Sequence, residues 1–168
     1  TFRDVELKEN SNLTLGEWLD KWLDERMRFT VRESTLDGYC RIANNYIKPH
    51  LGDKKIGSVT TADVQKMYNW LRENGRINEH YEKGNSLSDS SVRGIHMMLH
   101  QAMDAAVQER IIVKNPTGGT VIPKANYAPK NILTEAQLQK FLEVVRQDDV
   151  WSDFFYTELT TGMRRGEI

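Results

Sequence analysis

The sequence predicts an all-α fold in this chain, and three observations support that prediction. Apolar residues recur at intervals of three and four, as they do on the buried face of a helix. Segments with this repeat begin at Ser or Thr, in two cases with the Glu or Gln three residues later that completes a capping box. No segment has the strong alternation of apolar and polar residues that is typical of a strand.

The first expected helix covers residues 14–28, with Thr14 as its cap and Glu17 as the partner in a capping box. The second is expected to begin at a cap on Ser34 and to end near Pro49. Cys40 lies on the apolar face of that second helix. Because the chain has no other cysteine, it cannot form an intramolecular disulfide, and we interpret Cys40 as a packing residue suited to a reducing compartment.

A third helix is expected from a cap at Thr60 or Thr61 to residue 74, and a long fourth helix over residues 88–110. The stretch GRINEHYEKGNSLSD between them is polar and rich in turn formers, which favours a surface loop.

Prolines and glycines interrupt the helical pattern after residue 110, so we expect a linker and a domain boundary at residues 117–131. Thr134 and Gln137 then form a second capping box at the start of a helix, and a very apolar helix follows that Gly162 can end in a left-handed conformation. Residues 132–168 are too few to supply a good core of their own, which favours the first part of a truncated second domain.

The net charge of −1 is a mild argument against nucleic-acid binding, because phosphate neutralisation needs an excess of Lys and Arg. The distribution is uneven, however: residues 110–134 contain basic residues and no acid, whereas residues 1–37 contain nine acids and six bases. No apolar run approaches the roughly 20 residues needed to cross a bilayer.

The last nine residues, TTGMRRGEI, place two arginines in a glycine-rich turn after an apolar helix. A guanidinium held in such a turn can bind a phosphate through two parallel hydrogen bonds. On spacing alone, two solvated arginines in a loop are the more common interpretation.

This stretch resembles the first active-site motif of the tyrosine recombinases, which include phage and conjugative-transposon integrases: Thr161, Gly162, Arg164, Gly166 and Glu167 match T-G-x-R-x-G-E. Leu15–Leu19, Ile47–Gly52 and the stretch from Ile95 to Ala102 are similar to the core-binding domain of these enzymes. The resemblance implies a tether at residues 1–12, a four-helix SAM-like core-binding domain at 13–116, the basic linker at 117–131, and the start of a mainly α catalytic domain at 132–168.

The resemblance also implies a mechanism without cofactor or metal. Arg164 would be a catalytic residue that holds the scissile phosphate, and Glu167 would brace it. The remaining catalytic groups, including the tyrosine that forms a 3′-phosphotyrosyl link, would follow Ile168. This chain is therefore expected to bind double-stranded DNA at an attachment site without cleaving it. The full-length protein would be a cytoplasmic, nucleoid-associated tetramer on DNA with no membrane contact.

Polar residues on the second and fourth expected helices and basic residues after them are the candidates for DNA contact. They are Arg41, Asn44, Asn45, Lys48, Ser90, Ser91, Arg93, Lys114, Lys124 and Lys130.

Two alternatives remain open at this point. The chain could be a non-catalytic helical DNA-binding regulator, although its unpartnered apolar helices argue against that. The chain could also be a metal-dependent hydrolase that uses His96 and His100, which have the spacing of a metal-binding pair on a helix. The glutamate of the H-E-x-x-H motif is missing, however, and no third ligand is evident.

Overall fold

The structure is a computed structural model that describes residues 12–77, 84–124 and 131–168. The chain divides into two units, Thr1–Asn126 and Tyr127–Ile168, which we describe separately. In the described ranges the regular elements are all helices, and β pairing is limited to one isolated bridge between Thr14 and Lys55. This confirms the predicted all-α fold class.

The first two predicted helices are present, and each contains a turn of π-helix. The first rod runs through α1 (Leu15–Trp22), the π turn η1 (Leu23–Met27) and α2 (Arg28–Thr30). The second rod runs through α3 (Glu33–Ile42), the π turn η2 (Ala43–Ile47) and α4 (Lys48–Leu51). A π turn adds a residue to the helix and so shifts the register of the side chains around it.

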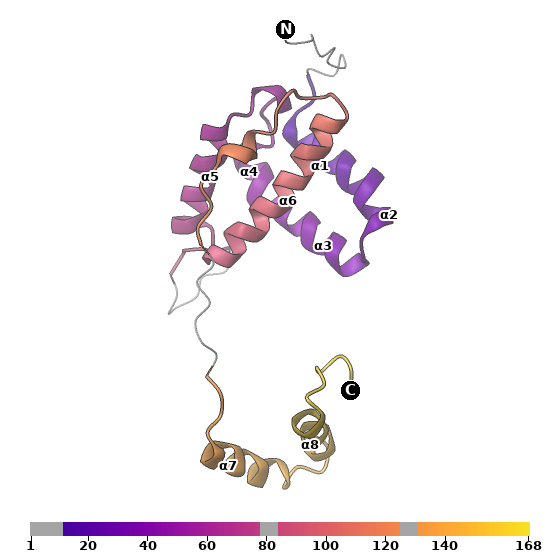
Figure 1. Cartoon of the computed structure of the whole chain (residues 1–168), viewed down its shortest axis with the longest axis vertical. Coiled ribbons are helices and arrows are strands. Elements are labelled where there is room, and N and C mark those ends of the chain that lie inside the picture. Colours follow the sequence, from indigo (N-terminus) through magenta and orange to yellow (C-terminus); the bar gives the residue numbers. More distant parts are fainter. Residues whose placement is uncertain (1–11, 78–83, 125–130) are drawn as a thin grey trace. The chain divides into compact units, whose positions relative to one another are not determined.

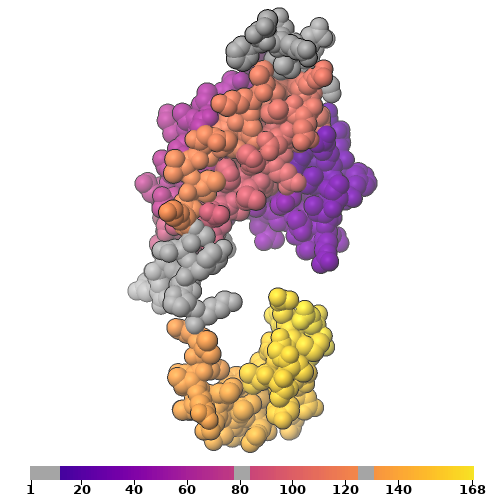
Figure 2. Space-filling model, viewed as in Figure 1, coloured from indigo at the N-terminus to yellow at the C-terminus, as the bar shows by residue number. Residues whose placement is uncertain are grey.

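Two longer helices complete the first unit. They are α5 (Thr61–Asn74) and α6 (Asp89–Gln108), and short 3₁₀ turns lie at η3 (Ile56–Ser58) and η4 (Pro116–Gly119). Helix α6 contacts α1, α3 and α5 and crosses the front of the unit in the view of Figure 1. Residues 111–124, which follow α6, lie along the surface of this unit (Figure 2).

The capping boxes predicted at Thr14 and Thr134 are confirmed, and Thr60 forms a third one with Asp63. The predicted cap at Ser34 is wrong. Arg32 takes the extended N-cap conformation, and its carbonyl accepts the first helical hydrogen bonds, from Thr35 and Leu36. Because the helix begins at Glu33, Ser34 lies inside the first turn, where its hydroxyl cannot act as an N-cap.

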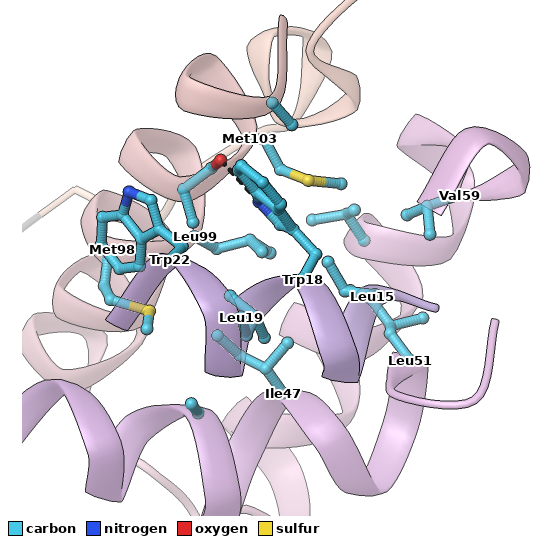
Figure 3. Close-up of a cluster of buried hydrophobic side chains, with 14 of the residues drawn as sticks. Leu15, Trp18, Leu19, Trp22, Ile47, Leu51, Val59, Met98, Leu99 and Met103 are labelled. Carbon is cyan, nitrogen blue, oxygen red and sulfur yellow. Dashed lines mark hydrogen bonds between the residues drawn. The ribbon is translucent and has the colours of Figure 1, made fainter. Parts of the chain in front are cut away.

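The core of the first unit is built around two tryptophans of α1, Trp18 and Trp22, which pack against Met98, Leu99 and Met103 of α6 (Figure 3). The Trp18 indole Nε1–H donates to the carbonyl of Ala102 at 2.9 Å, inside this cluster. Trp18 therefore joins α1 to α6 through both apolar contact and a buried hydrogen bond.

Backbone hydrogen bonds fix the first rod against the end of the second. Gly16 N–H donates to the Gly52 carbonyl at 2.9 Å, and Leu15 N–H donates to the Lys54 carbonyl at 2.8 Å. A Cβ at Gly16 would lie 3.2 Å from the Gly52 oxygen, so glycine permits this close approach.

The second unit contains α7 (Glu135–Val145) and α8 (Ser152–Thr161). Gly162 ends α8 with φ of 67°, as predicted. Phe141, Trp151, Phe154 and Phe155 contact one another edge to face, yet they stay partly or largely exposed. In the described part of this unit only Val145 is a buried hydrophobic residue, so these helices have little core of their own.

The Trp18 contact generates a stability prediction. Trp18→Phe removes the hydrogen bond to Ala102 and leaves unfilled space beside α6, so we expect the free energy of unfolding to fall by about 1–3 kcal/mol. Urea denaturation followed by circular dichroism measures it. Trp70→Phe, at a side chain that is 46% exposed, is the matched control and should change little. Equal losses in the two variants would contradict this description of the core.

Candidate nucleic-acid interface

A polar groove of about 510 Å³ lies between the second rod, the end of α5 and the start of α6. Its described lining residues include two arginines, two serines and no carboxylate. They are Arg41, Asn45, Tyr46, Arg76, Ile77, Leu87, Ser88 and Ser91. This concentration of cationic and hydrogen-bonding groups makes the groove suited to an anionic ligand.

The two sides of the groove come from different helices. Arg41 and Asn45 are four residues apart on the second rod, and both are exposed. On the other side, Ser88 caps α6 by accepting from the Ser91 N–H at 3.2 Å, and the two hydroxyls lie 2.8 Å apart. The unpaired N–H groups of the first turn of α6 add partial positive charge there.

Arg76 also lines the groove, although it is not among the contact residues predicted from the sequence. Its backbone N–H donates to the Asn85 carbonyl at 2.8 Å, and its Nε donates to the Ser86 carbonyl at 3.3 Å. These bonds restrain Arg76, which lines the groove together with Arg41. Arg76 follows α5 in a polar, aperiodic stretch, where neither spacing nor composition distinguishes it from a solvated arginine.

The structure separates Asn44 and Lys48 from this groove. Asn44 lines another cleft with Asp20, Asp24 and other residues, and Lys48 Nζ forms an ion pair with Asp20 Oδ1 at 2.5 Å. A regular α-helical repeat would place Asn44 and Lys48, three and seven residues after Arg41, on one face with it. The π turn at Ala43–Ile47 changes that register, so Asn45 rather than Asn44 shares the groove with Arg41.

The other predicted contact residues lie along α6 and after it. Ser90 and Arg93 are exposed near the start of α6, and one guanidinium nitrogen of Arg93 (Nη1) donates to the Pro123 carbonyl at 3.3 Å. Lys114 is exposed after the far end of α6, and Lys124 is exposed at the last described residue before the gap. Lys130 lies outside the described residues.

In the second unit, Arg164 and Glu167 form a braced turn. The Arg164 N–H donates to Glu167 Oε2 at 2.9 Å, and the Arg164 guanidinium lies 3.4 Å from Glu167 Oε1. The Glu167 N–H in turn donates to the Arg164 carbonyl at 2.7 Å. The Arg164 side chain is 88% exposed, so its guanidinium remains accessible to a phosphate while Glu167 restricts the backbone.

The two histidines of α6 are engaged in hydrogen bonds within the first unit. His96 is buried, with Nδ1 3.1 Å from the Tyr68 hydroxyl, and His100 Nδ1 lies 2.6 Å from the Thr117 hydroxyl. Burial raises the pKa of Tyr68, which keeps that hydroxyl protonated. In the part of the chain that the structure describes, no group of three or more His, Cys, Asp or Glu side chains could hold a metal ion.

A search of the described residues for a membrane span finds no helix that is both long and apolar enough.

Comparison with known proteins finds similarity to phage integrases and tyrosine recombinases. Residues 14–72 match the model for the N-terminal SAM-like domain of phage integrases. A tyrosine recombinase XerC-like protein from Caldanaerobacter subterraneus subsp. tengcongensis is 26% identical over 164 residues, which is 94% of this chain and 39% of that protein.

Solved structures agree with this result. The Tn1549 transposon integrase in complex with circular intermediate DNA superposes with a TM-score of 0.71 at 26% identity, over 91% of this chain and 47% of that one. A lambda integrase dimer bound to a core site shares the fold, with a TM-score of 0.72 at 21% identity over 90% of this chain and 40% of that one. The chain thus spans less than half the length of these relatives.

The environment of His96 generates a prediction on pH. Burial lowers the pKa of His96 from 6.5, and the positive charges of His100 and Arg93 lower it further. Near and below pH 6.5, the His96 side chain is therefore protonated more readily in the unfolded chain than in the folded chain. The free energy of unfolding should fall as the pH decreases through this value. Urea denaturation at pH 7.5 and pH 5.5 measures this loss.

His96→Gln should make the loss smaller without abolishing it, because burial also lowers the pKa of His50. An unchanged pH dependence in His96→Gln would contradict the assignment to His96.

Proposed function

We propose that the chain belongs to the tyrosine recombinase family of phage integrases and that it is the DNA-clamping part of a site-specific recombinase that integrates or excises a mobile element. The groove lined by Arg41, Asn45, Arg76 and Ser91 is the observation that carries this proposal. Its described lining brings together cationic side chains, an amide and hydroxyls and contains no carboxylate, which suits contact with a phosphate backbone.

Within this groove the contacts divide by chemistry. Arg41 and Arg76 supply guanidinium groups for phosphate oxygens, and the N-terminal turn of α6 adds backbone N–H groups beside Ser91. Asn45 is the candidate for contact with a base edge, since a side-chain amide can pair with adenine through two hydrogen bonds. Asn44 and Lys48 are weaker candidates, because Asp20 lies next to them and would repel a phosphate.

For the complete protein we propose strand exchange through a covalent intermediate. A tyrosine hydroxyl attacks the scissile phosphorus, a 3′-phosphotyrosyl bond forms, and the strand leaves as a free 5′-hydroxyl; attack by another 5′-hydroxyl reverses the step. Arg164 would bind the non-bridging oxygens and stabilise the charge of the transition state, held in place by Glu167. The tyrosine is proposed to lie outside the present chain, which would bind DNA without cleaving it.

We also propose a domain organisation and an oligomeric state for the complete protein. We place the core-binding domain at residues 13–116, the linker at 117–131 and the start of the catalytic domain at 132–168. The complete recombinase would act as a tetramer on two DNA sites at the bacterial nucleoid. A lambda integrase tetramer bound to a Holliday junction, at 21% identity and with a TM-score of 0.67, supports this through likeness of fold.

DNA binding should depend steeply on salt. Each lost phosphate contact makes the negative slope of log affinity against log salt shallower by about one. It also weakens binding by about tenfold near 0.1 M salt. We expect this for Arg41→Gln and for Arg76→Gln, measured by fluorescence anisotropy with a labelled duplex. Lys21→Gln, which removes an exposed charge on α1 that is paired with Glu25 of η1, is the control. Binding that does not change between low and moderate salt would refute the phosphate contacts.

The role of Arg164 is tested in the full-length protein. Arg164→Gln should reduce the covalent protein–DNA adduct on a nicked attachment-site substrate by about a hundredfold or more, with little loss of DNA affinity. Arg165→Gln, at the neighbouring exposed arginine, should leave adduct formation close to normal. If both variants lose the adduct equally, Arg164 has no special role, and if no adduct forms in the unmodified protein, the chain belongs to a non-catalytic DNA binder.

A further inference from the structure

We infer that Gln65 is a positioning residue: it holds the linker against the surface of the first unit and so places Lys124 where it can contact DNA. We define the strap as residues 115–124, the described segment that follows α6 and carries the 3₁₀ turn η4. This inference goes beyond the proposed function by assigning a role to residues that make no direct contact with DNA.

The central anchor of the strap is the side-chain amide of Gln65 on α5. Gln65 Oε1 accepts from the Val121 N–H at 2.7 Å, and Gln65 Nε2 donates to the Val121 carbonyl at 3.3 Å. One side chain thus satisfies both backbone groups of one strap residue, as a neighbouring strand would. Gln65 Nε2 also donates to Asn69 Oδ1 at 3.1 Å, one turn further along α5, which holds the amide in this orientation.

A second anchor holds the beginning of the strap against α6. Asn115 Nδ2 donates to the His100 carbonyl at 3.1 Å and to Asp104 Oδ1 at 2.7 Å. Thr117, which is 1% exposed, accepts or donates to His100 Nδ1 through its hydroxyl at 2.6 Å. The side chains of Asn115 and Thr117 therefore hydrogen-bond mainly to α6. If the strap left the surface here, these hydrogen bonds would be broken, which costs free energy.

The third anchor is Arg93, whose guanidinium binds the Pro123 carbonyl at 3.3 Å. The order of contacts gives the direction of the strap: it starts beside His100 and Asp104 of α6, passes Gln65 and reaches Arg93 near the start of α6. Figures 1 and 2 show this course beside α5.

The spacing of contacts also fits an extended strap. Gly119 lies against Thr61, where an added Cβ would be 3.2 Å from the Thr61 methyl, and Val121 meets Gln65. Two residues of extended chain cover about 6.6 Å, and the four residues of helix between Thr61 and Gln65 rise about 6 Å.

The course of the strap places Lys124 near the start of α6, which borders the groove. Helix α6 ends far from the groove, yet the strap returns the chain to the end of α6 that carries Ser91 and Arg93 before Lys124 emerges. Clamping the strap in advance reduces the conformational entropy that would otherwise be lost when Lys124 meets a phosphate. A free linker of the same sequence would have to lose that entropy on binding.

The test uses Gln65→Ala in the 168-residue chain, with Gln101→Ala on the exposed side of α6 as the matched control. Gln65→Ala should raise the hydrogen exchange rate of the Val121 amide by at least about tenfold, while exchange within α6 and the urea midpoint stay unchanged. Unchanged exchange at Val121, or a rise spread over the whole unit, would overturn the clamp.

A double-mutant cycle with Lys124→Gln then tests the link to DNA. Gln65→Ala should weaken duplex binding by about threefold, and Lys124→Gln should have little further effect in that background, because the two changes remove the same contact. Additive losses would refute positioning of Lys124 by Gln65. This second readout rests on the proposed function. If neither the unmodified chain nor any variant binds DNA, the proposed function is wrong. The hydrogen-exchange experiment still tests whether Gln65 holds the strap.

Discussion

The structure of the first unit depends on the burial of α6. Its apolar face, from Val92 to Ala106, is covered by α1, α3 and α5, and Trp18 adds a hydrogen bond to the carbonyl of Ala102 within that contact. This contact fixes the positions of α1, α3 and α5 relative to one another. The beginning of α6 therefore meets the second rod at the groove, and its later turns hold Asn115 and Thr117 at the origin of the strap.

Much of this arrangement could be predicted from the sequence, because it depends on local patterns. Helical periodicity located the four long helical segments, and the capping residues Thr14 and Thr134 marked two of the starts. The cap at Ser34 was misplaced because Arg32 can take the N-cap conformation without a side-chain hydrogen bond, which leaves no mark in the sequence. The π turns were missed for a similar reason, since an added residue in one turn hardly disturbs the apolar pattern.

The candidate site could be predicted only in part, because it is made by tertiary contacts. Arg41, Asn45 and Ser91 were found on helical faces, and the structure brings them to one groove. Arg76 enters that groove through hydrogen bonds to Asn85 and Ser86, which no spacing rule predicts. The π turn moves Asn44 to a cleft that it shares with Asp20 and Asp24. The net charge of −1 thus conceals a groove whose described lining carries no acid.

We propose that DNA binds in this groove and not in the cleft that Asn44 shares with Asp20 and Asp24. The most direct measurement is a titration of the isotopically labelled chain with an attachment-site duplex, followed by backbone amide NMR. The account predicts chemical shift changes concentrated at Arg41, Asn45, Arg76 and Ser91, with small changes at Asp24 and Asn44. Changes concentrated around Asp24 and Asn44, or the absence of any change at saturating duplex, would contradict it.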